Sequence, residues 1–331
     1  MNYIGSKHKL STFISQCIYD VCGDDLSAMT FCDLFAGTGI VGRTFKSKVA
    51  KVIANDLEYY SYVLNRNYIG NTVTFNTGHL INKLNKVSEE DGFIAQEYGE
   101  SGRAGRQYFT SENARKIDGS RKAIENWKET KEINENEYYF LLASLLESAD
   151  KVANTASVYG AFLKHIKNSA AKPLLLEAAS FEMTTTAHKV HQEDSNLLIK
   201  HIDGDILYLD PPYNARQYGA NYHLLNTIAK YDTFTPKGKT GLRVYEKSAF
   251  CSKTNVKQAF ENLIAQAQFK YIFLSYNNEG LMPATMVREI MKRYGRYDLI
   301  TTIYQRFKAD KTVNRNHKAN QTIEYLHILE K

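Results

Sequence analysis

The sequence predicts an α/β fold in which a parallel sheet is covered by helices and interrupted by one mostly helical insertion. Two strand–turn–helix units stand near the start of the chain, at residues 30–48 and 51–69. Residues 76–186 then show helical spacing and no strand alternation, and apolar β-forming runs resume near residue 190. Repeated strand–helix pairs are typical of a parallel sheet with helices on its faces.

The first part of the chain supplies two strands that end in polar turns. Residues 30–35 form a β-like run that ends at Ala36-Gly37-Thr38-Gly39, and residues 40–48 follow with helical spacing. Residues 51–54 form a second run that ends at Asn55-Asp56, before a helical pattern over 57–69. A strand, a turn and a helix therefore occur twice in succession.

The insertion is expected to be helical and basic. Residues 99–122 are rich in Gly, Ser and basic side chains, which suggests flexible loops. Residues 125–152 have the spacing of one or two amphipathic helices around Trp127 and Leu142. We therefore expect one domain formed by residues 1–75 and 187–331, and an inserted domain over residues 76–186.

The last part of the chain completes the sheet. A buried strand over 206–209 ends at Asp210-Pro211-Pro212-Tyr213. The remaining elements are expected as strands near 190–192, 271–276, 299–306 and 322–329, and as helices over 222–231, 256–268 and 284–294.

Composition is that of a globular protein without membrane segments. The 331 residues are 43% hydrophobic and 24% charged, and the longest apolar run, 138–146, is too short to span a bilayer. The four cysteines lack metal-ligand spacing, so we expect reduced thiols, a cytoplasmic location and no metal. A net charge of +6 permits an anionic partner.

The glycine turn after the first strand predicts a nucleoside-binding site. Gly37, Gly39 and Gly42 have the spacing Gly-x-Gly-x-x-Gly, and Asp33 and Phe35 precede them. Such a turn lets a ligand lie against the backbone, and an upstream carboxylate suits a cationic amino-acid head group. Asp56, after the next strand, suits ribose hydroxyls. A tight turn without ligand and a nicotinamide dinucleotide site are the alternatives.

Asp210-Pro211-Pro212-Tyr213 predicts chemistry on an aromatic amine. Two adjacent prolines cannot continue a sheet ladder, so they make a rigid exit from the strand. The Asp210 carboxylate and the Pro211 carbonyl can accept the two hydrogens of an exocyclic amine and favour a pyramidal nitrogen with an outward lone pair. The Tyr213 ring offers a face on which a base can stack, once that base has left the duplex. An ordinary strand-ending loop is the alternative.

Taken together, these motifs resemble the alpha group of adenine-specific DNA methyltransferases, the Dam-like family of restriction–modification enzymes. Tyr3-Ile4-Gly5-Ser6-Lys7 resembles the N-terminal cofactor motif, although many members carry tryptophan where this chain has Tyr3. The segment from Asp33 through Phe35 and Ala36 to Gly39 resembles the glycine-rich motif, and Asn55-Asp56 the acidic one. Further similarities lie at Glu193-Asp194-Ser195, at Asp210–Tyr213, at Leu274-Ser275-Tyr276-Asn277 and at Glu324-Tyr325-Leu326.

The resemblance implies a seven-stranded mixed, Rossmann-like sheet with the recognition region inserted between its cofactor and catalytic halves. On this resemblance, residues 1–75 and 187–331 form the catalytic domain, and residues 76–186 form the target-recognition domain. It implies S-adenosylmethionine as methyl donor, direct transfer to N6 of a flipped adenine in double-stranded DNA, and no metal. It also implies a cognate restriction endonuclease as functional partner; a monomer is our default. On this resemblance the cofactor site comprises Tyr3, Gly5, Lys7, Asp33, Phe35, Ala36, Gly37, Gly39, Asp56, Asp194, Ser195 and Asp210.

Basic residues in the insertion and after the catalytic motif are the expected DNA contacts, since cations bind phosphates and interleaved aromatics such as Tyr108-Phe109 suit bases. Ordinary solvated loops are the alternative for the insertion and for a basic stretch over 306–318. Arg216 and Tyr218 are expected on a loop that folds over the flipped base, whereas His223 is expected to be structural. The candidates are Arg103, Arg106, Arg115, Lys116, Arg121, Lys122, Lys164, Arg216 and Tyr218.

Three other functions remain open from the sequence. A guanine-modifying RNA methyltransferase could share the glycine turn and Asp210–Tyr213, although the long insertion counts against such compact enzymes. A DNA-binding regulator on a degenerate methyltransferase fold is a second alternative, and the intact Asp33, Asp56 and Asp210 argue against it. A nicotinamide dehydrogenase would have no use for Asp210–Tyr213.

Overall fold

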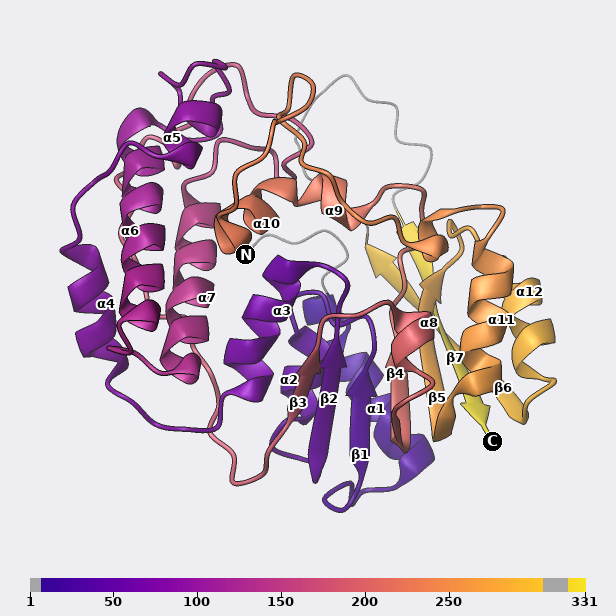
Figure 1. Cartoon of the computed structure of the whole chain (residues 1–331). Helices are drawn as coiled ribbons and strands as arrows, with labels where there is room; N and C mark the ends of the chain where they lie inside the picture. The colour runs from indigo at the N-terminus through magenta and orange to yellow at the C-terminus, as the bar shows by residue number, and fades with distance from the viewer. Residues whose placement is uncertain (1–6, 306–320) are drawn as a thin grey trace. The chain divides into compact units, whose positions relative to one another are not determined.

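The computed structural model describes residues 7–305 and 321–331, which form two compact units (Figure 1). The sheet unit comprises Ser6–Leu57, Thr184–Gln217 and Glu246–Lys331, and the helical unit includes Glu58–Met183 and Tyr218–Tyr245. Three sequence expectations, at Tyr3, at Gly5 and in the basic stretch 306–318, lie outside the described residues.

The sheet unit has the seven-stranded mixed sheet that the sequence predicts. Its order is β3-β2-β1-β4-β5-β7-β6, and β7 pairs antiparallel with both β5 and β6, while the other described pairs are parallel. The strands are β1 (Thr30–Asp33), β2 (Lys51–Asn55), β3 (Lys189–His191), β4 (Asp203–Leu209), β5 (Gln268–Asn277), β6 (Arg296–Gln305) and β7 (Gln321–Glu330).

Side-chain alternation along β1 divides the core of this unit into two layers. Cys32 faces a cluster with Leu207, Ile272 and Phe260, whereas its neighbour Phe31 stacks on Phe45 with ring centroids 4.4 Å apart. Because successive strand residues point to opposite faces, helices must cover both sides of the sheet. The helices of this unit are η1 (Lys7–Lys9), α1 (Ser11–Cys22), α2 (Ile40–Phe45), α8 (Ser195–Leu198), η3 (Ala249–Cys251), α11 (Val256–Gln266) and α12 (Ala284–Met291).

The helical unit is built around α6 and α7. The N-cap of α6, Thr110, accepts a hydrogen bond from Asn113 N, and α7 begins with a capping box between Asn134 and Glu137. Its helices are α3 (Tyr59–Asn65), the π-helical turn η2 (Arg66–Gly70), α4 (Thr77–Asn85), α5 (Phe93–Tyr98), α6 (Ser111–Glu129), α7 (Glu135–Lys151), α9 (Tyr218–Asn221) and α10 (His223–Lys230).

The boundaries of the units differ from those of the expected domains. The helical stretch over 57–69 was expected in the catalytic domain, but α3 packs against α7 and α10 of the helical unit. Asn226 of α10 accepts a hydrogen bond from Tyr60 N at 2.9 Å, which fixes this packing. Residues 218–245, which follow the catalytic motif, also belong to the helical unit.

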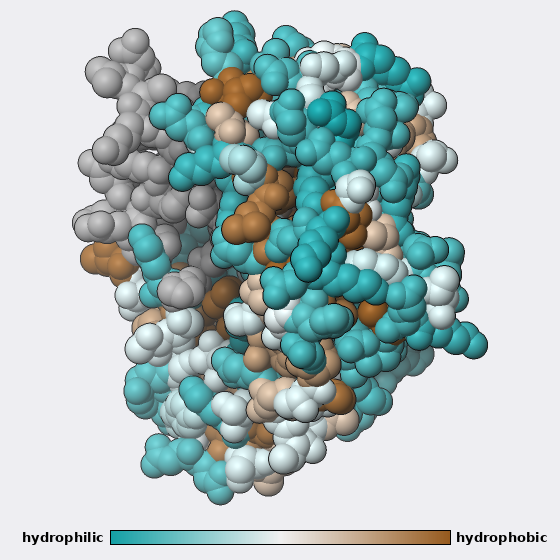
Figure 2. All heavy atoms as spheres, turned by 90° about the vertical axis from the view of Figure 1, so that its left-hand side faces the viewer, coloured by the Kyte–Doolittle hydropathy of each residue, from teal (hydrophilic) through white to brown (hydrophobic). Residues whose placement is uncertain are grey.

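The surface gives no sign of a membrane segment within the described part of the chain. Across residues 7–305 and 321–331, every helix is too short or too polar to cross a bilayer. The face in Figure 2 is largely hydrophilic, and its hydrophobic residues lie in scattered patches.

Candidate active site

The carboxyl ends of β1, β2 and β4 meet at one edge of the sheet. Asp33 of β1 is in register with Ala54 of β2 on one side and with Tyr208 of β4 on the other. The polar residues that end or follow these strands, Asp33, Asp56 and Asp210, therefore share this edge. Ligands of parallel α/β sheets bind where the connections that follow two adjacent strands lead to opposite sides, as they do here after β1, which leads to β2, and after β4, which leads to β5.

The glycine turn after β1 requires glycine at two positions. Gly37 has φ +52° and Gly39 has φ +76°, the left-handed region that other L-residues rarely adopt. Asp56 braces the turn, because its Oδ2 accepts a hydrogen bond from Gly37 N at 2.8 Å. Ala36 N donates to Asn55 O at 2.8 Å, so the end of β2 holds both sides of the turn.

Asp33 is a buried carboxyl with one unsatisfied oxygen. Its side chain is 1% exposed, and its Oδ2 accepts a hydrogen bond from Gly42 N at 3.1 Å. Its Oδ1 has no hydrogen-bond partner among the described residues. Burial raises the pKa of Asp33 to about 8; the Gly42 N–H opposes this shift, and the charges of Asp210 and Asp56 add to it. A buried carboxylate oxygen without a partner is costly unless a donor or a cation meets it.

Asn55 connects the glycine turn to the segment before α8. Its Nδ2 donates to Leu34 O at 3.2 Å and to Glu193 O at 3.0 Å, and its Oδ1 accepts from Glu193 N. The Oδ1 of Asp194 caps α8 by accepting from Asn196 N and Leu197 N, and Ser195 is buried in its first turn. Phe35 contacts the Phe250 ring edge-on, with centroids 5.0 Å apart. The sequence predicted Asp194 and Ser195 at the cofactor but missed Asn55 as the connecting residue.

Asp210, Lys7 and Glu324 form a buried charge cluster at the same edge. Lys7 Nζ lies 3.1 Å from Asp210 Oδ1 and 3.9 Å from Glu324 Oε2. Burial raises the pKa of Asp210 to about 6, while Lys7 opposes the rise and Glu324 adds to it. Burial is the largest single influence and lowers the pKa of Lys7, but the charges of Asp210, Tyr213, Tyr208 and Glu324 together outweigh it, so the pKa stands above its usual range. The cluster thus keeps Lys7 charged and Asp210 largely ionised at neutral pH.

Tyr213 completes this cluster. Lys7 Nζ lies 5.2 Å from the centroid of the Tyr213 ring, and Tyr276 meets the same ring edge-on at 5.9 Å. Tyr213 O accepts a hydrogen bond from Leu281 N at 3.0 Å, so both the ring and the backbone are held. Pro211 is buried and Pro212 is half-buried, as suits a rigid exit from β4. The arrangement offers a carboxylate and an aromatic face side by side.

Glu324 was missed as a site residue by sequence reasoning. The motif Glu324-Tyr325-Leu326 was assigned only to a closing strand, yet the antiparallel pairing of β7 with β5 sets Glu324 opposite Asn277 at the carboxyl end of β5. A signal was present in the sequence, because an acid among the apolar residues of a buried strand needs a partner.

The predicted flexible basic loop over 99–122 is wrong from residue 111 onward, where the chain forms α6. Arg121, expected at DNA, is 3% exposed, and its guanidinium donates to Ala229 O, Glu125 and Tyr138. Lys116 donates to the carbonyl of Asn85, the last residue of α4, and to Val87 O just beyond the helix. Both side chains have structural partners, so their assignment as DNA contacts is corrected.

The other expected cations of the helical unit are distributed differently. Arg115 pairs with Glu89 and Lys122 with Glu90, both at the surface. Arg106 and Arg103 share the buried carboxylate of Glu97. Lys164 is exposed. Tyr108 and Phe109, expected to stack on bases, are fully buried.

The residues after the catalytic motif fall in both units. Arg216, in the sheet unit, is exposed, whereas Tyr218 stacks on Tyr222 in the helical unit with centroids 6.1 Å apart. His223 is fully buried, and its Nε2 lies 3.0 Å from Tyr159 O. Burial lowers the pKa of His223 to about 4, the environment of a structural histidine.

Comparison with known proteins identifies the family. The profile of the D12 class N6 adenine-specific DNA methyltransferases matches residues 3–290. The type II methyltransferase M.NlaIII of Neisseria lactamica is 64% identical, over 100% of this chain and 99% of its own. M.FokI of Planomicrobium okeanokoites is 39% identical over 100% of this chain and 53% of its own, and M.CviAII of Paramecium bursaria Chlorella virus 1 is 38% identical over 93% of both. The chain therefore belongs to the D12 class of N6 adenine-specific DNA methyltransferases.

Proposed function

We propose that this chain transfers a methyl group from S-adenosylmethionine to N6 of a flipped adenine in duplex DNA, as the modification enzyme of a restriction–modification system. The observation that carries the proposal is the sheet edge at which Asp33 retains an unpartnered oxygen close to the Lys7–Asp210–Tyr213 cluster. The names of the three relatives, all type II methyltransferases, support a role beside a cognate endonuclease. We further propose that the enzyme acts as a monomer.

The residues at the edge fit the cofactor. The unpartnered Oδ1 of Asp33 is suited to the α-ammonium group of a bound amino acid, which would satisfy that oxygen and favour the ionised carboxylate. Gly37 and Gly39 allow close approach to the backbone, and Asp56 stands at the end of β2, where ribose hydroxyls are expected. When bound, S-adenosylmethionine supplies an electrophilic methyl group on its sulfonium.

The catalytic cluster would act on the amine of the base. Asp210, kept ionised by Lys7, accepts one N–H of the adenine amine and draws the nitrogen lone pair out of conjugation with the ring. Tyr213 stacks on the flipped base, a contact worth about 1–3 kcal/mol. Asp210 can then take the proton that the methylated nitrogen loses, so no histidine is required.

The DNA contacts that we retain are exposed cations outside the cluster. Arg216 follows the catalytic motif, and Arg103 and Lys164 lie on the helical unit. We expect Arg216→Ala to weaken DNA binding while leaving the affinity for S-adenosylmethionine unchanged.

The test is methylation of unmethylated plasmid DNA with labelled S-adenosylmethionine, followed by digestion to nucleosides. We expect the label in N6-methyladenine, and none with Asp210→Asn at S-adenosylmethionine concentrations that saturate the variant. A structured RNA is offered in parallel. Label in RNA alone would establish the RNA methyltransferase alternative, and cofactor binding without transfer to either substrate would favour the regulator.

A further inference from the structure

We infer that the turn Lys237–Leu242 of the helical unit is a preformed phosphate-binding element that grips the backbone of the substrate DNA. This inference rests on the proposed function in taking duplex DNA as the partner. The turn is closed by a reciprocal pair of hydrogen bonds, from Lys237 N to Leu242 O and from Leu242 N to Lys237 O, both 2.8 Å. Gly238 and Gly241 adopt φ +68° and +71°, which allows the tight reversal.

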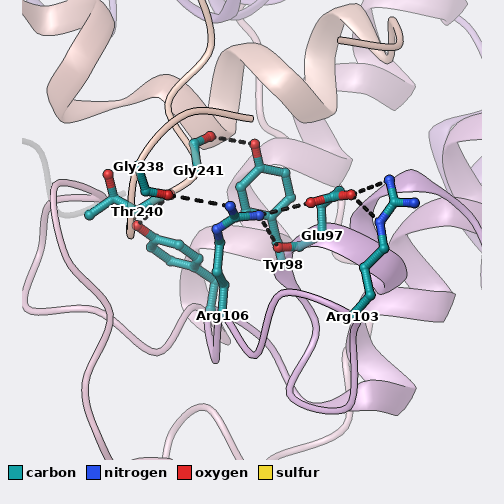
Figure 3. Close-up of polar contacts among 8 residues, drawn as sticks. Glu97, Tyr98, Arg103, Arg106, Gly238, Thr240 and Gly241 are labelled. Carbon is teal, nitrogen blue, oxygen red and sulfur yellow. Dashed lines mark hydrogen bonds and ion pairs between the residues drawn. The ribbon is translucent and has the colours of Figure 1, made fainter. Parts of the chain in front are cut away.

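Side chains from the segment 97–108 hold the turn by its carbonyl oxygens, as Figure 3 shows. Tyr98 Oη donates to Gly241 O at 2.6 Å. The hydroxyl hydrogen of Tyr108 is shared between Tyr159 O at 2.7 Å and Thr240 O at 3.2 Å. Arg106 Nη2 donates to Gly238 O at 3.3 Å. Three carbonyls of the turn are therefore bound to donors of the protein, and the conformation is fixed before any ligand arrives.

The turn keeps its hydrogen-bond donors available. The amide N–H groups of Gly238, Lys239 and Thr240 have no acceptor within the described part of the chain, although the carbonyls of two of these residues are satisfied. Lys237 and Lys239 are exposed. Successive free amides beside lysine ammonium groups form a donor set that suits an anion with several oxygens.

The anchor beneath the turn is also cationic. Glu97 is 4% exposed and its single carboxylate is shared by Arg103 and Arg106, which leaves one positive charge in excess (Figure 3). Asp232, the acid on the segment leading into the turn, pairs with Arg243 through two hydrogen bonds of 2.9 and 2.8 Å. Glu100 is the exposed acid of the anchoring segment, and it does not cancel the three cations Arg103, Lys237 and Lys239.

A phosphate on the DNA backbone is the ligand that fits this donor set. The turn presents amides and ammonium groups but no planar fork for reading a base edge, because the Arg106 guanidinium is occupied by Glu97 and Gly238. The contribution of the turn to DNA affinity should therefore be independent of base sequence and strongly dependent on salt concentration.

The experiment measures the salt dependence of binding to duplex DNA for the full chain, wild type against Lys239→Gln and the Lys237→Gln, Lys239→Gln double variant. Each lost phosphate contact makes the negative slope of log K against log salt shallower by about 0.9. The slope of the double variant should therefore be shallower than that of the wild type by about 1.8. Between 50 and 200 mM salt, its affinity should then fall about twelvefold less than that of the wild type. The same lysines changed to Arg should restore the slope.

Lys86→Gln is the matched control, because Lys86 is an exposed lysine of the same unit at the C-cap of α4, and its slope should equal that of the wild type. An unchanged slope in the double variant would overturn the inference while leaving the proposed methylation intact. A change in which sites are methylated would also overturn it, because it would indicate base reading. If the wild type shows the steeper slope but does not methylate DNA, the proposed function is rejected and the phosphate-binding role of the Lys237–Leu242 turn is supported.

Discussion

Asp33 couples the stability of the cofactor-free protein to pH. Burial raises its pKa to about 8 from the ordinary 3.8, with the Gly42 N–H acting against the rise and the charges of Asp210 and Asp56 acting with it. The folded state therefore keeps a proton that the unfolded state loses, and the group's contribution to stability declines as pH rises from about 4 to about 8.

The first prediction follows from this linkage. Asp33→Asn should remove this decline. Between pH 5.5 and pH 8, the free energy of unfolding of the wild type should therefore fall by about 2–3 kcal/mol more than that of the variant. Urea unfolding of both cofactor-free proteins measures the difference. Asp203→Asn, a change at an exposed acid of the same unit, should track the wild type at both pH values. Calorimetry should show weaker S-adenosylmethionine binding for Asp33→Asn alone; equal affinity would contradict the role given to Oδ1.

Lys7 sets the pH range over which Asp210 is ionised. The pKa of Asp210 is raised to about 6 by burial, against the opposing charge of Lys7 3.1 Å away. The single-turnover methylation rate should therefore fall as pH drops through about 6. Removing the cation by Lys7→Met should move this acid limb to higher pH by at least about one unit, since the opposite charge within 4 Å is lost.

Two further variants test whether the acid limb of the pH–rate profile belongs to Asp210. Lys9→Met removes an exposed cation from the same 3-10 helix and should leave the midpoint unchanged. Glu324→Gln removes the like charge that raises the pKa of Asp210, so its midpoint should move to lower pH. Midpoints that stay together in all four proteins would show that another group limits the rate.

At the scale of elements, Arg121 joins two helices of the helical unit. From α6 it donates through Nε and Nη2 to Ala229 O in the last turn of α10, and through Nη1 to Glu125 at 2.7 Å. A guanidinium at a helix C-terminus satisfies a carbonyl and opposes the negative end of the helix dipole.

Arg121→Ala should accordingly destabilise the protein by about 3 kcal/mol, because a buried charge-assisted network loses its donor. Lys122→Ala, one residue away with an exposed pairing to Glu90, should cost less than about 0.5 kcal/mol. Chemical denaturation compares the two variants. Equal and small losses would indicate that Arg121 is solvent-accessible, and would reopen its assignment to DNA.

The seven strands and helix α6 illustrate which elements the sequence was sufficient to predict and which it was not. Each of the seven strands could be predicted, because apolar runs such as 206–209 end abruptly in polar turns. The part of α6 before residue 123 could not, since Gly119 within it suggests a flexible loop when considered alone. In the structure a Cβ at Gly119 would lie 2.1 Å from Ser88 O, so the glycine serves close packing within a helix. Glu324 was missed for a similar reason, because only strand pairing brings it to Lys7.

At the scale of the whole molecule, the chain passes repeatedly between the two units. The residues proposed to bind the cofactor, Lys7, Asp33, Asp56 and Asp210, all belong to the sheet unit, and the Lys237–Leu242 turn belongs to the helical unit. Cofactor and DNA backbone should therefore order different parts of the chain. A ligand stabilises the segments that it contacts, by about 2.7 kcal/mol when present at a hundred times its Kd.

Hydrogen exchange should separate the two effects. S-adenosylmethionine should slow exchange in the glycine turn over 36–42, because Asp33 and this turn both belong to the sheet unit. Exchange in residues 237–242, which belong to the helical unit, should stay unchanged. Duplex DNA without cofactor should slow exchange at the amides of Gly238, Lys239 and Thr240, which lack acceptors among the described residues. The Lys237→Gln, Lys239→Gln variant should lose the second effect and keep the first. Protection of both segments by the cofactor alone would show that the units respond together, and the independence argued from their separate contacts would fail.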